Sequence, residues 1–396
     1  MIEFNSIKIG NLGNVITGRT PKTSVPENFG NDFMFVGPTD LHKHFVISSS
    51  EKMISKTGLA TIKSATIEGL SICVGCIGWD MGNVGLVNGK CATNQQINSI
   101  TNIKNDYNPY YIYYWLKGKK DYLFQQASVT RTPILNKSSF SDIEISVPPK
   151  NYQDSVADLL TAIDKKIELN NKINAELEAM AKLIYDYWFV QFDFPDANGK
   201  PYKSSGGKMV YNQELKREIP EDWGDTTLGD ICDLYQPQTI SGKEMRSDGK
   251  YLVYGANGIV GKYDKFNHEQ CVVTITCRGN TCGTINTTRP FSWITGNAMV
   301  AKPRLEFLSI DYILNSLCWA NVSTTITGSA QPQITRANLA PLKLVAPDSI
   351  VIQKYSNLVT VNYARRLIAL EENEQLIELR DWLLPMLMNG QVTVNN

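Results

Sequence analysis

The stretch KNYQDSVADLLTAIDKKIELNNKINAELEAMAKLIYDYWFVQFDF, residues 150–194, contains neither Pro nor Gly. A second stretch without either residue covers 348–384. The whole chain has 28 Gly and 17 Pro, so both helix breakers are kept out of two long windows. Because a breaker is costly inside a helix, the windows predict two long helices. The chain therefore reads as a globular segment followed by a long helix, twice.

Apolar residues of the first window follow steps of four and three, the spacing of a coiled-coil seam. They are Val156, Leu160, Ile163, Ile167, Leu177, Ala181, Ile184 and Trp188, with Asn170 and Asn174 in the two gaps. Polar residues in such a seam fix register and partner at some cost in stability. A lone helix of this length has nothing to cover its seam, so we expect the two helices to pack on each other. The alternative is two unrelated helices, each covering its own domain.

The two halves also match outside the helices, which indicates a duplication. Tyr111-Ile112 aligns with Tyr312-Ile313, and the segments ending in Pro148 and Pro347 align. Further matches are Leu12-Gly13 with Leu228-Gly229, Cys73-Val74 and Gly85 with Cys271-Val272 and Gly283, Lys165-Lys166 with Arg365-Arg366, and Leu183-Ile184 with Leu383-Leu384. The repeating unit is far longer than a solenoid repeat.

Each half combines strands, a Gly-rich turn and a short helix. Strands are expected at 71–78 and 271–277, turns at 80–85 and 278–283, and helices at 109–117 and 311–319. Asn108 suits the N-cap position, because Pro109 would then be the first helical residue. The fold class is therefore predicted as α+β, with two similar small domains and two long helices.

Composition is that of a globular protein, with 396 residues, enough for two or three domains, and 42% hydrophobic residues. The N-terminus shows no signal peptide and no apolar run reaches the length of a membrane span, so a cytoplasmic protein is expected. The eight unclustered Cys predict buried, reduced thiols.

The net charge of zero hides a difference between segments. Residues 1–148 hold 14 Lys and Arg against 11 Asp and Glu, net +3, and residues 223–347 hold 11 against 9, net +2. The helical segments compensate, with 10 against 13 in 149–222 and 4 against 6 in 348–396. The globular parts are thus mildly positive, which permits DNA binding without requiring it.

Motifs for catalysis are nearly absent from the sequence. There is no Gly-x-x-x-x-Gly-Lys-Ser/Thr loop for ATP, and a total of three His does not favour a His-centred triad or metal cluster. Cys73-x-x-Cys76 lacks the second pair of a zinc site. Asn108-Pro-Tyr-Tyr111 is faintly similar to the Asn-Pro-Pro-Tyr signature of adenine methyltransferases, but it lacks the second Pro, and a helix cap explains it better.

The turns and nearby loops carry side chains suited to reading base edges, since Asn and Gln pair with adenine and Arg pairs with guanine. The candidates in the first half are Arg19, Thr20, Lys22, Asn83, Asn94, Gln95, Gln96 and Arg131. Those in the second half are Gln236, Gln238, Arg278, Asn280, Asn297, Gln331, Gln333 and Arg336. For each residue, ordinary loop chemistry is the alternative.

With these features in place, the chain resembles the specificity subunits of type I restriction–modification enzymes. The resemblance covers nearly the whole chain and is carried mainly by 163–194 with Ile219-Pro-Glu-Asp-Trp223, by 379–391, and by Gly18-Arg-Thr-Pro21. One departure is that the first half lacks the Trp that precedes Leu-Gly in the second half.

The resemblance implies an architecture for the whole chain. Two target-recognition domains, 1–148 and 223–347, would each read one half of a bipartite, asymmetric DNA site. They would be separated by two long helices, in 149–222 and 348–396, packed as an antiparallel coiled coil that sets the spacer.

The resemblance also implies a non-catalytic subunit, with no catalytic, metal or cofactor site of its own, in the cytoplasm of a prokaryote. Its partners would be double-stranded DNA and two methyltransferase subunits that use S-adenosylmethionine to methylate adenine. A restricting complex would add two restriction subunits that use ATP and Mg.

Two alternatives remain open at this point. A self-contained methyltransferase would bind its cofactor without a partner, although the motifs for this are missing. A structural adaptor would bind protein rather than DNA, and a gel shift at stated salt with the methyltransferase partner separates that case.

Overall fold

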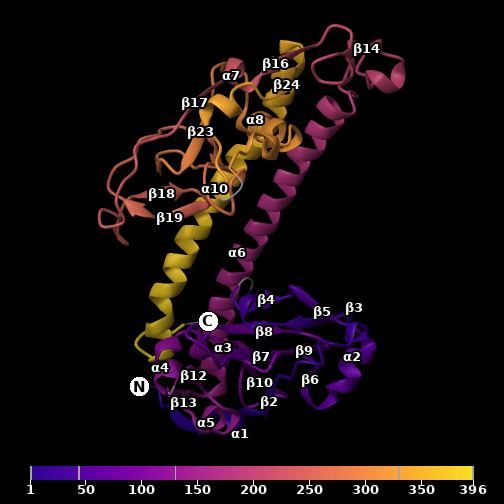
Figure 1. Ribbon diagram of the computed structural model, residues 1–396. Helices are drawn as coiled ribbons and strands as arrows, with labels where there is room; N and C mark the ends of the chain where they lie inside the picture. The colour runs from indigo at the N-terminus through magenta and orange to yellow at the C-terminus, as the bar shows by residue number, and fades with distance from the viewer. Residues whose placement is uncertain (1, 43–44, 130, 329–330, 395–396) are drawn as a thin grey trace. The chain divides into compact units, whose positions relative to one another are not determined.

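The computed structural model describes residues 2–42, 45–129, 131–328 and 331–394, and the chain divides into two compact units. Unit 1 is Met1–Asn171 with Glu371–Asn396, and unit 2 is Lys172–Leu370. The long helices α6 (Lys150–Tyr185) and α10 (Ser349–Met388) contribute to both units (Figure 1). Within the described ranges, no helix is both long and apolar enough to cross a membrane.

Unit 1 is an α+β unit built on two mixed sheets. Its strands are β1 (Asn5–Lys8), β2 (Asn14–Thr17), β3 (Phe29–Val36), β4 (Val46–Ile47), β5 (Lys52–Ile54), β6 (Thr66–Ile67), β7 (Ser71–Gly75), β8 (Val84–Val87), β9 (Cys91–Thr93), β10 (Ile97–Thr101), β11 (Ser128–Val129), β12 (Pro133–Ile134) and β13 (Glu144–Val147). Its short helices are α1 (Ile9–Leu12), α2 (Lys56–Thr61), α3 (Pro109–Lys117), α4 (Lys120–Gln125) and α5 (Lys137–Asp142).

The larger sheet of unit 1 has the order β2-β10-β7-β8-β4, and the second has the order β5-β3-β9-β6. Helix α3 lies against the larger sheet and α2 lies beside β3 (Figure 1). The core of the unit joins apolar residues of the larger sheet and α3 to the first turns of α6 and the last turns of α10, where Leu160 and Leu387 are fully buried. The unit therefore includes its own ends of the long helices.

Unit 2 repeats this plan with shorter sheets. Its strands are β14 (Met209–Asn212), β15 (Arg217–Pro220), β16 (Gly224–Thr227), β17 (Cys232–Tyr235), β18 (Tyr251–Gly255), β19 (Gly258–Tyr263), β20 (Val273–Thr276), β21 (Ile285–Thr287), β22 (Trp293–Ile294), β23 (Ala298–Pro303) and β24 (Lys343–Ala346). Its short helices are α7 (Leu228–Ile231), α8 (Ile310–Trp319) and α9 (Arg336–Leu339).

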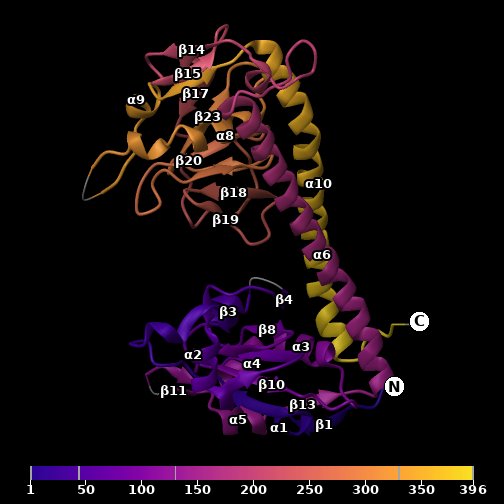
Figure 2. The same cartoon turned by 90° about the vertical axis from the view of Figure 1, so that its right-hand side faces the viewer.

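The sheets of unit 2 have the orders β17-β23-β20-β21 and β19-β18-β22. Helix α8 packs on β20, β21 and β23 (Figure 2). The core collects aromatic side chains from several elements, and the ring of Phe189 lies 5.2 Å from those of Tyr312 and Tyr355. Edge-to-face aromatic pairs of this kind add to the burial of their area.

The predicted strands, turns and short helices are present in both units, although both central strands are shorter than predicted and β8 begins inside the turn expected at 80–85. Asn108 caps α3, since its side-chain oxygen accepts hydrogen bonds from the amides of Tyr110 and Tyr111 at 2.9 and 3.2 Å. Ser309 caps α8 in the same way through Tyr312. The helix-cap interpretation of the Asn108 motif is therefore confirmed.

The duplication is present, but two of the sequence matches are wrong by three residues. Gly10 and Gly229 occupy equivalent places, each against the end of the short helix before β13 or β24, so the partner of Leu228-Gly229 is Ile9-Gly10 rather than Leu12-Gly13. In this register Phe4 stands where the second half has Trp223, so an aromatic residue is present after all.

The second error concerns the central strand of each unit. Strand β10 pairs with β7 through Ile97 and Gly75, and β23 pairs with β20 through Ala298 and Thr276. The equivalent of Gly283 is therefore Gly82, not Gly85, and Cys73-Val74 is equivalent to Thr274-Ile275, not to Cys271-Val272. Gly82 and Gly283 have φ angles of +90° and +91°, a region that residues with a side chain rarely adopt.

Both long helices exist, but their ends differ from the predicted windows. The α-helical part of the first window stops at Tyr185, a π-helical turn follows at Asp186–Val190, and Phe192 has a φ angle of +66°. Burial of aromatic side chains overrides helix continuity here. The second helix runs past Leu384 and through Pro385 to Met388, because a Pro near a helix end gives up only one backbone hydrogen bond.

The two helices pack against each other and run antiparallel. In unit 1, Asp164 meets Arg380 and Asn170 meets Asn373. In unit 2, the hydroxyl of Tyr355 on α10 donates to the carbonyl oxygen of Ala181 on α6 at 3.0 Å. The predicted pairing is confirmed, and the alternative of two unrelated helices is wrong.

The predicted seam is buried at its ends and polar in its middle. Val156, Leu160 and Trp188 are buried, whereas Ile167 and Leu177 are partly exposed. Both polar side-chain atoms of Asn174 are buried, and the described residues offer them no hydrogen-bond partner. Asn170 and Asn174, which fill the two gaps in the predicted apolar pattern, lie in this polar centre.

The cysteines are free. Five of the eight are buried, two are half-buried and Cys318 is exposed, so the expectation of buried thiols is correct for most of them. No group of three or more potential metal ligands gathers anywhere in the described ranges.

Candidate nucleic-acid interface

In unit 1, the turn after β7 and the hairpin β11–β12 form one surface. The amide of Gly78 donates to the carbonyl oxygen of Pro133 at 3.0 Å, and the amide of Leu135 donates to that of Cys76 at 2.8 Å. The amide of Cys76 in turn donates to the carbonyl oxygen of Gln96 at 2.7 Å. Three segments far apart in the sequence are thus joined at one end of the sheet. We call this surface reader 1, residues 77–83, 94–96 and 131–134.

Unit 2 builds the same surface with the same hydrogen bonds. The amide of Gly279 donates to the carbonyl oxygen of Pro332 at 3.2 Å, and that of Ile334 donates to Cys277 at 2.9 Å. The amide of Cys277 donates to the carbonyl oxygen of Asn297 at 3.1 Å. We call this surface reader 2, residues 278–284, 295–297 and 331–333.

Glycines shape both turns. Gly78 and Gly82 have φ angles of +100° and +90°, and Gly279 and Gly283 have +88° and +91°. Each pair lets the chain reverse tightly after the central strand, since these angles are strained for other residues. The backbone of the two readers is therefore alike, and only the side chains that it displays differ.

Most candidates of the first half gather at reader 1. The segment of Arg19 and Thr20 lies against it, because the Arg19 amide donates to the Thr93 carbonyl oxygen at 2.9 Å and the Thr20 hydroxyl donates to Gln95 Oε1 at 2.5 Å. The other candidates gathered there are Asn83, Asn94, Gln96 and Arg131.

Two of these side chains, Asn94 and Gln96, are hydrogen-bonded to each other. Asn94 Nδ2 donates to Gln96 Oε1 at 3.0 Å, so these amides bind each other.

Lys22 is the one candidate of the first half that lies elsewhere. Its carbonyl oxygen accepts from Asn28 Nδ2 at 2.9 Å in the loop that leads to β3. Within the described ranges nothing joins its side chain to reader 1.

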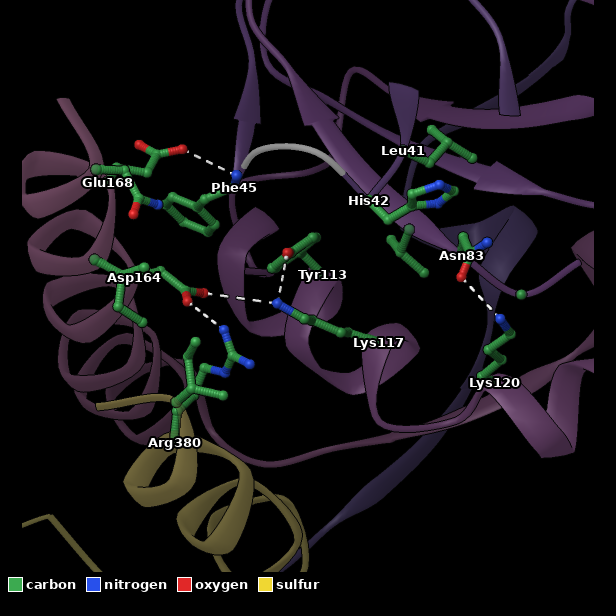
Figure 3. A pocket seen from close by; sticks show the side chains of 15 residues that line it. Leu41, His42, Phe45, Asn83, Tyr113, Lys117, Lys120, Asp164, Glu168 and Arg380 are labelled. Carbon is green, nitrogen blue, oxygen red and sulfur yellow. Dashed lines mark hydrogen bonds and ion pairs between the residues drawn. The ribbon is translucent and has the colours of Figure 1, made fainter. Parts of the chain in front are cut away.

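Asn83 is committed to the turn. Its Nδ2 donates to the carbonyl oxygen and to Oδ2 of Asp80, both at 3.0 Å, and its Oδ1 accepts from Lys120 Nζ at 3.0 Å. Figure 3 shows the Asn83 side chain directed at Lys120. The lysine also pairs with Asp80 at 2.7 Å. A base contact by Asn83 would have to replace these bonds.

The candidates of the second half gather at reader 2, where, among the described residues, fewer of their side chains are hydrogen-bonded to neighbours than at reader 1. Arg278 and Gln333 face each other across a backbone bridge, and both side chains are exposed, as is that of Asn280. Gln236 Nε2 donates to the carbonyl oxygen of Gly296 at 3.2 Å. The other members near this surface are Gln238, Asn297, Gln331 and Arg336, the last being the first residue of α9.

Two residues of these surfaces are missing from the candidates. Asn257, in the turn between β18 and β19, donates from Nδ2 to the Thr281 hydroxyl at 2.7 Å and so braces the turn of reader 2. Trp79 lies in the turn of reader 1 and its side chain is 71% exposed. The repeat was the sequence signal for Trp79, because in the correct register Trp79 is equivalent to Asn280.

The globular part of unit 1 is attached to the long helices through the buried carboxylate of Asp164. Asp164 of α6 accepts from the Tyr114 hydroxyl at 2.7 Å. It also accepts from Arg380 Nη1 at 2.6 Å, and Lys117 Nζ lies 3.9 Å away (Figure 3). Glu168 accepts from the Phe45 amide at 2.9 Å. Asp164, Glu168, Lys117 and Arg380 are among the residues that line a cavity of about 390 Å³.

Charge balance explains why this arrangement is stable. Burial lowers the pKa of Lys117, while the nearby Asp164 carboxylate opposes that shift. Removing one partner of such a set leaves a buried charge without compensation, which is strongly destabilising. The cluster therefore fixes the globular part of unit 1 against its helix ends.

Unit 2 uses a different pair for the same purpose. Arg366 of α10 bonds to Asp311 of α8 at 3.2 Å and to Glu178 of α6 at 3.3 Å. Burial raises the pKa of Asp311 to about 6, although Arg366 opposes the shift. The Tyr363 hydroxyl donates to the Thr288 carbonyl oxygen at 3.2 Å and adds a second attachment.

Two unlike readers on one duplicated backbone frame define a recognition protein of two modules. Comparison with known proteins gives its family. Residues 1–179 and 220–378 match the family described as Type I restriction modification DNA specificity domain, and the chain belongs to this family. It is the DNA specificity subunit of a type I restriction–modification system, a non-catalytic recognition subunit.

Relatives of full length support the assignment. The specificity subunit of type I restriction enzyme MjaIX from Methanocaldococcus jannaschii is 25% identical and covers 99% of this chain and 94% of its own. That of HindI from Haemophilus influenzae is 32% identical over 66% of this chain and 71% of its own. The crystal structure of the S subunit from M. genitalium has a TM-score of 0.59 at 17% identity, covering 98% and 96% of the two chains, so it shares the fold.

Proposed function

We propose that each unit reads one half of a bipartite, asymmetric site in double-stranded DNA. The observation that carries this proposal is the pair of readers, which share their backbone hydrogen bonds but display different side chains. A single target read twice would need like side chains at equivalent positions. Here Arg278 and Gln333 correspond to Ile77 and Ile134, so the two halves of the site would differ.

We further infer that 1–148 and 223–347 are separable recognition domains and that 149–222 and 348–396 form the frame between them. The matching antiparallel contacts of α6 and α10 support a frame whose helix length sets the spacer of the DNA site. The candidates that gather at the readers would then supply base or backbone contacts, and Arg278, Asn280, Gln331 and Gln333 among them are exposed.

The partners follow from the family and from the surface of the helices. We propose assembly with two methyltransferase subunits, which bind S-adenosylmethionine and methylate adenine in each half-site, in the cytoplasm of a prokaryote. A restricting complex would add two subunits that use ATP and Mg. Exposed apolar side chains on both helices, such as Leu183, Ile368 and Trp382, offer surface to such partners.

A domain exchange tests the division of labour. Residues 1–148 are replaced by the same region of a relative, and the methylated sites of a host carrying the chimera and its methyltransferase partner are sequenced. One half-site should change and the half read by 223–347 should persist, because the readers share no residues. A change of both halves together would contradict independent reading.

The same experiment, repeated in a host that lacks the partner subunit, separates the alternatives. A self-contained methyltransferase would methylate the host DNA without a partner subunit, and an adaptor that binds protein would leave no methylated motif that follows the exchanged region.

A further inference from the structure

The side chain of Trp79 is unusually open for a tryptophan. It is 71% exposed, and its ring contact is the Phe124 ring, with centroids 6.1 Å apart. Tryptophan side chains are highly buried on average, so an exposed one at the tip of a turn is informative. Its place in reader 1 makes it a surface feature of the proposed interface.

The turn does not depend on the indole. It is closed by backbone bonds, with the Gly82 amide donating to the Gly75 carbonyl oxygen at 2.8 Å. It is braced by Asp80, Asn83 and Lys120, which bond to one another. Figure 3 shows the bond between Asn83 and Lys120. A purely structural role therefore leaves Trp79 unexplained.

The repeat gives Trp79 its place in the reader. In the shared hydrogen-bond register, Trp79 corresponds to Asn280, Ile77 to Arg278 and Ile134 to Gln333. Ile134 is itself 41% exposed. Three positions that display polar side chains in reader 2 thus display apolar side chains in reader 1. The two isoleucines cannot hydrogen-bond to bases and the Trp79 indole offers a single N–H donor, whereas all three side chains can contact the methyl group of thymine.

We propose that Trp79, together with Ile134, contacts the C5-methyl group of a thymine in the half-site read by unit 1. This inference rests on the proposed function, since it assumes that reader 1 faces base edges in the major groove. Reader 2 would recognise its half by hydrogen bonds, and reader 1 would recognise one position of its half by apolar contact.

Replacement of thymine by uracil isolates the contact, because deoxyuridine lacks the methyl group and keeps every hydrogen-bonding group. The complex of the full chain with its methyltransferase partner is bound, at one stated salt concentration, to duplexes that carry the methylated motif. Thymines of the half-site that follows residues 1–148 are replaced one at a time. Loss of one buried methyl group should weaken binding of the wild-type complex about fourfold at one position.

The Trp79→Ala complex should bind thymine and uracil duplexes equally at that position, and Trp79→Phe should keep part of the preference. Asn280→Ala, at the equivalent place in reader 2, is the matched control and should keep the full thymine preference. A thermal melt of each variant checks that the exposed substitution leaves the fold intact.

Three results would overturn the proposal. They are a wild-type complex that is indifferent to uracil at every position, an unchanged thymine preference in Trp79→Ala, and an equal loss of affinity for all duplexes, which would place the indole on the sugar–phosphate backbone. Failure of the proposed function would look different from failure of this inference. In that case, exchanging residues 1–148 would change neither half of the methylated motif.

Discussion

Arg278 is an exposed arginine of reader 2 at a position that the backbone fixes. A bidentate pair between arginine and guanine contributes about 1–3 kcal/mol of discrimination. Arg278→Ala should therefore weaken target binding by that amount and relax the preference at one base pair. Competition binding at fixed salt and sequencing of methylated sites measure both effects.

Arg304→Ala is the control for this substitution. Arg304 pairs with Asp233 at 2.8 Å, at the opposite end of β23 from reader 2, and should not affect the target. Unchanged affinity and preference in Arg278→Ala would mean that the arginine only completes the turn.

Asp311 should give the stability of unit 2 a pH dependence. Burial raises its pKa to about 6, from 3.8. Between these values the folded state holds a proton that the unfolded state has lost, so the free energy of unfolding should fall as pH rises from about 4 to about 6. In Asp311→Asn this fall should be absent.

Urea unfolding of the full chain at several pH values, followed by the signals of unit 2, measures the slope. If wild type and Asp311→Asn had the same slope, the carboxyl group would already be ionised in the folded state throughout this range.

At the scale of elements, the polar contact inside unit 1 between the long helices has a testable role. Asn373 is buried, accepts from Asn170 Nδ2 at 2.9 Å and donates to Asn171 Oδ1 at 2.8 Å. Asn373→Leu removes both bonds. Asn170 Nδ2 keeps its bond to Glu372 Oε2 at 2.8 Å and Asn171 is exposed to water, so the helix pair should be destabilised by about 0.5–1.5 kcal/mol.

Hydrogen exchange of the α10 amides in unit 1 reports this loss locally. Gln375→Leu, which places the same side chain at an exposed position of α10, should leave the exchange rates unchanged. Slower exchange in Asn373→Leu would show that the polar contact lowers stability and is kept for register alone.

A four-residue insertion in α6 tests the proposed frame. Four helical residues placed near Ala175-Glu176-Leu177 lengthen a helix by about 6 Å and rotate the remainder of the helix by about 40° beyond one turn. A coiled coil absorbs such a stutter by local unwinding. Since DNA rises about 3.4 Å per base pair, the spacer should grow by one or two base pairs while both half-sites stay the same.

Sequencing of methylated sites gives the spacer directly. A full-length control replaces Ala175 by another good helix former without changing the length, and it should keep the original spacer. An unchanged spacer in a fully active insertion variant would assign the distance to linkers or to partner subunits.

The same elements show how far sequence reasoning reaches. Absence of Pro and Gly predicted both long helices, because helix breakers act locally. The ends of the helices were missed, because burial of Phe189 and Phe192 in the core of unit 2 depends on residues far along the chain. The matches at Gly13 and Gly85 failed because residue identity does not reveal which glycine has a positive φ angle.

For the whole molecule, the sequence indicated many of the polar residues of each reader, but it did not show that separate segments of the chain meet there. The candidates were chosen by side-chain type, and most of them meet because hairpin β11–β12 and its counterpart in unit 2 pair with the central turns. The roles of these residues remain predictions. Trp79 was overlooked because an apolar side chain does not match the hydrogen-bonding code used in the search.

The shared backbone frame has a consequence for how such a protein can change. At the equivalent positions 77, 79 and 134 in one unit and 278, 280 and 333 in the other, unlike residues are accepted by the same hydrogen-bonded turn. If the side chains at these positions select the target, as proposed, folding depends on the main-chain atoms of these residues and target choice on their side chains. A library randomised at these six codons should yield mostly folded proteins, so new targets are accessible by point mutation without passing through unstable intermediates.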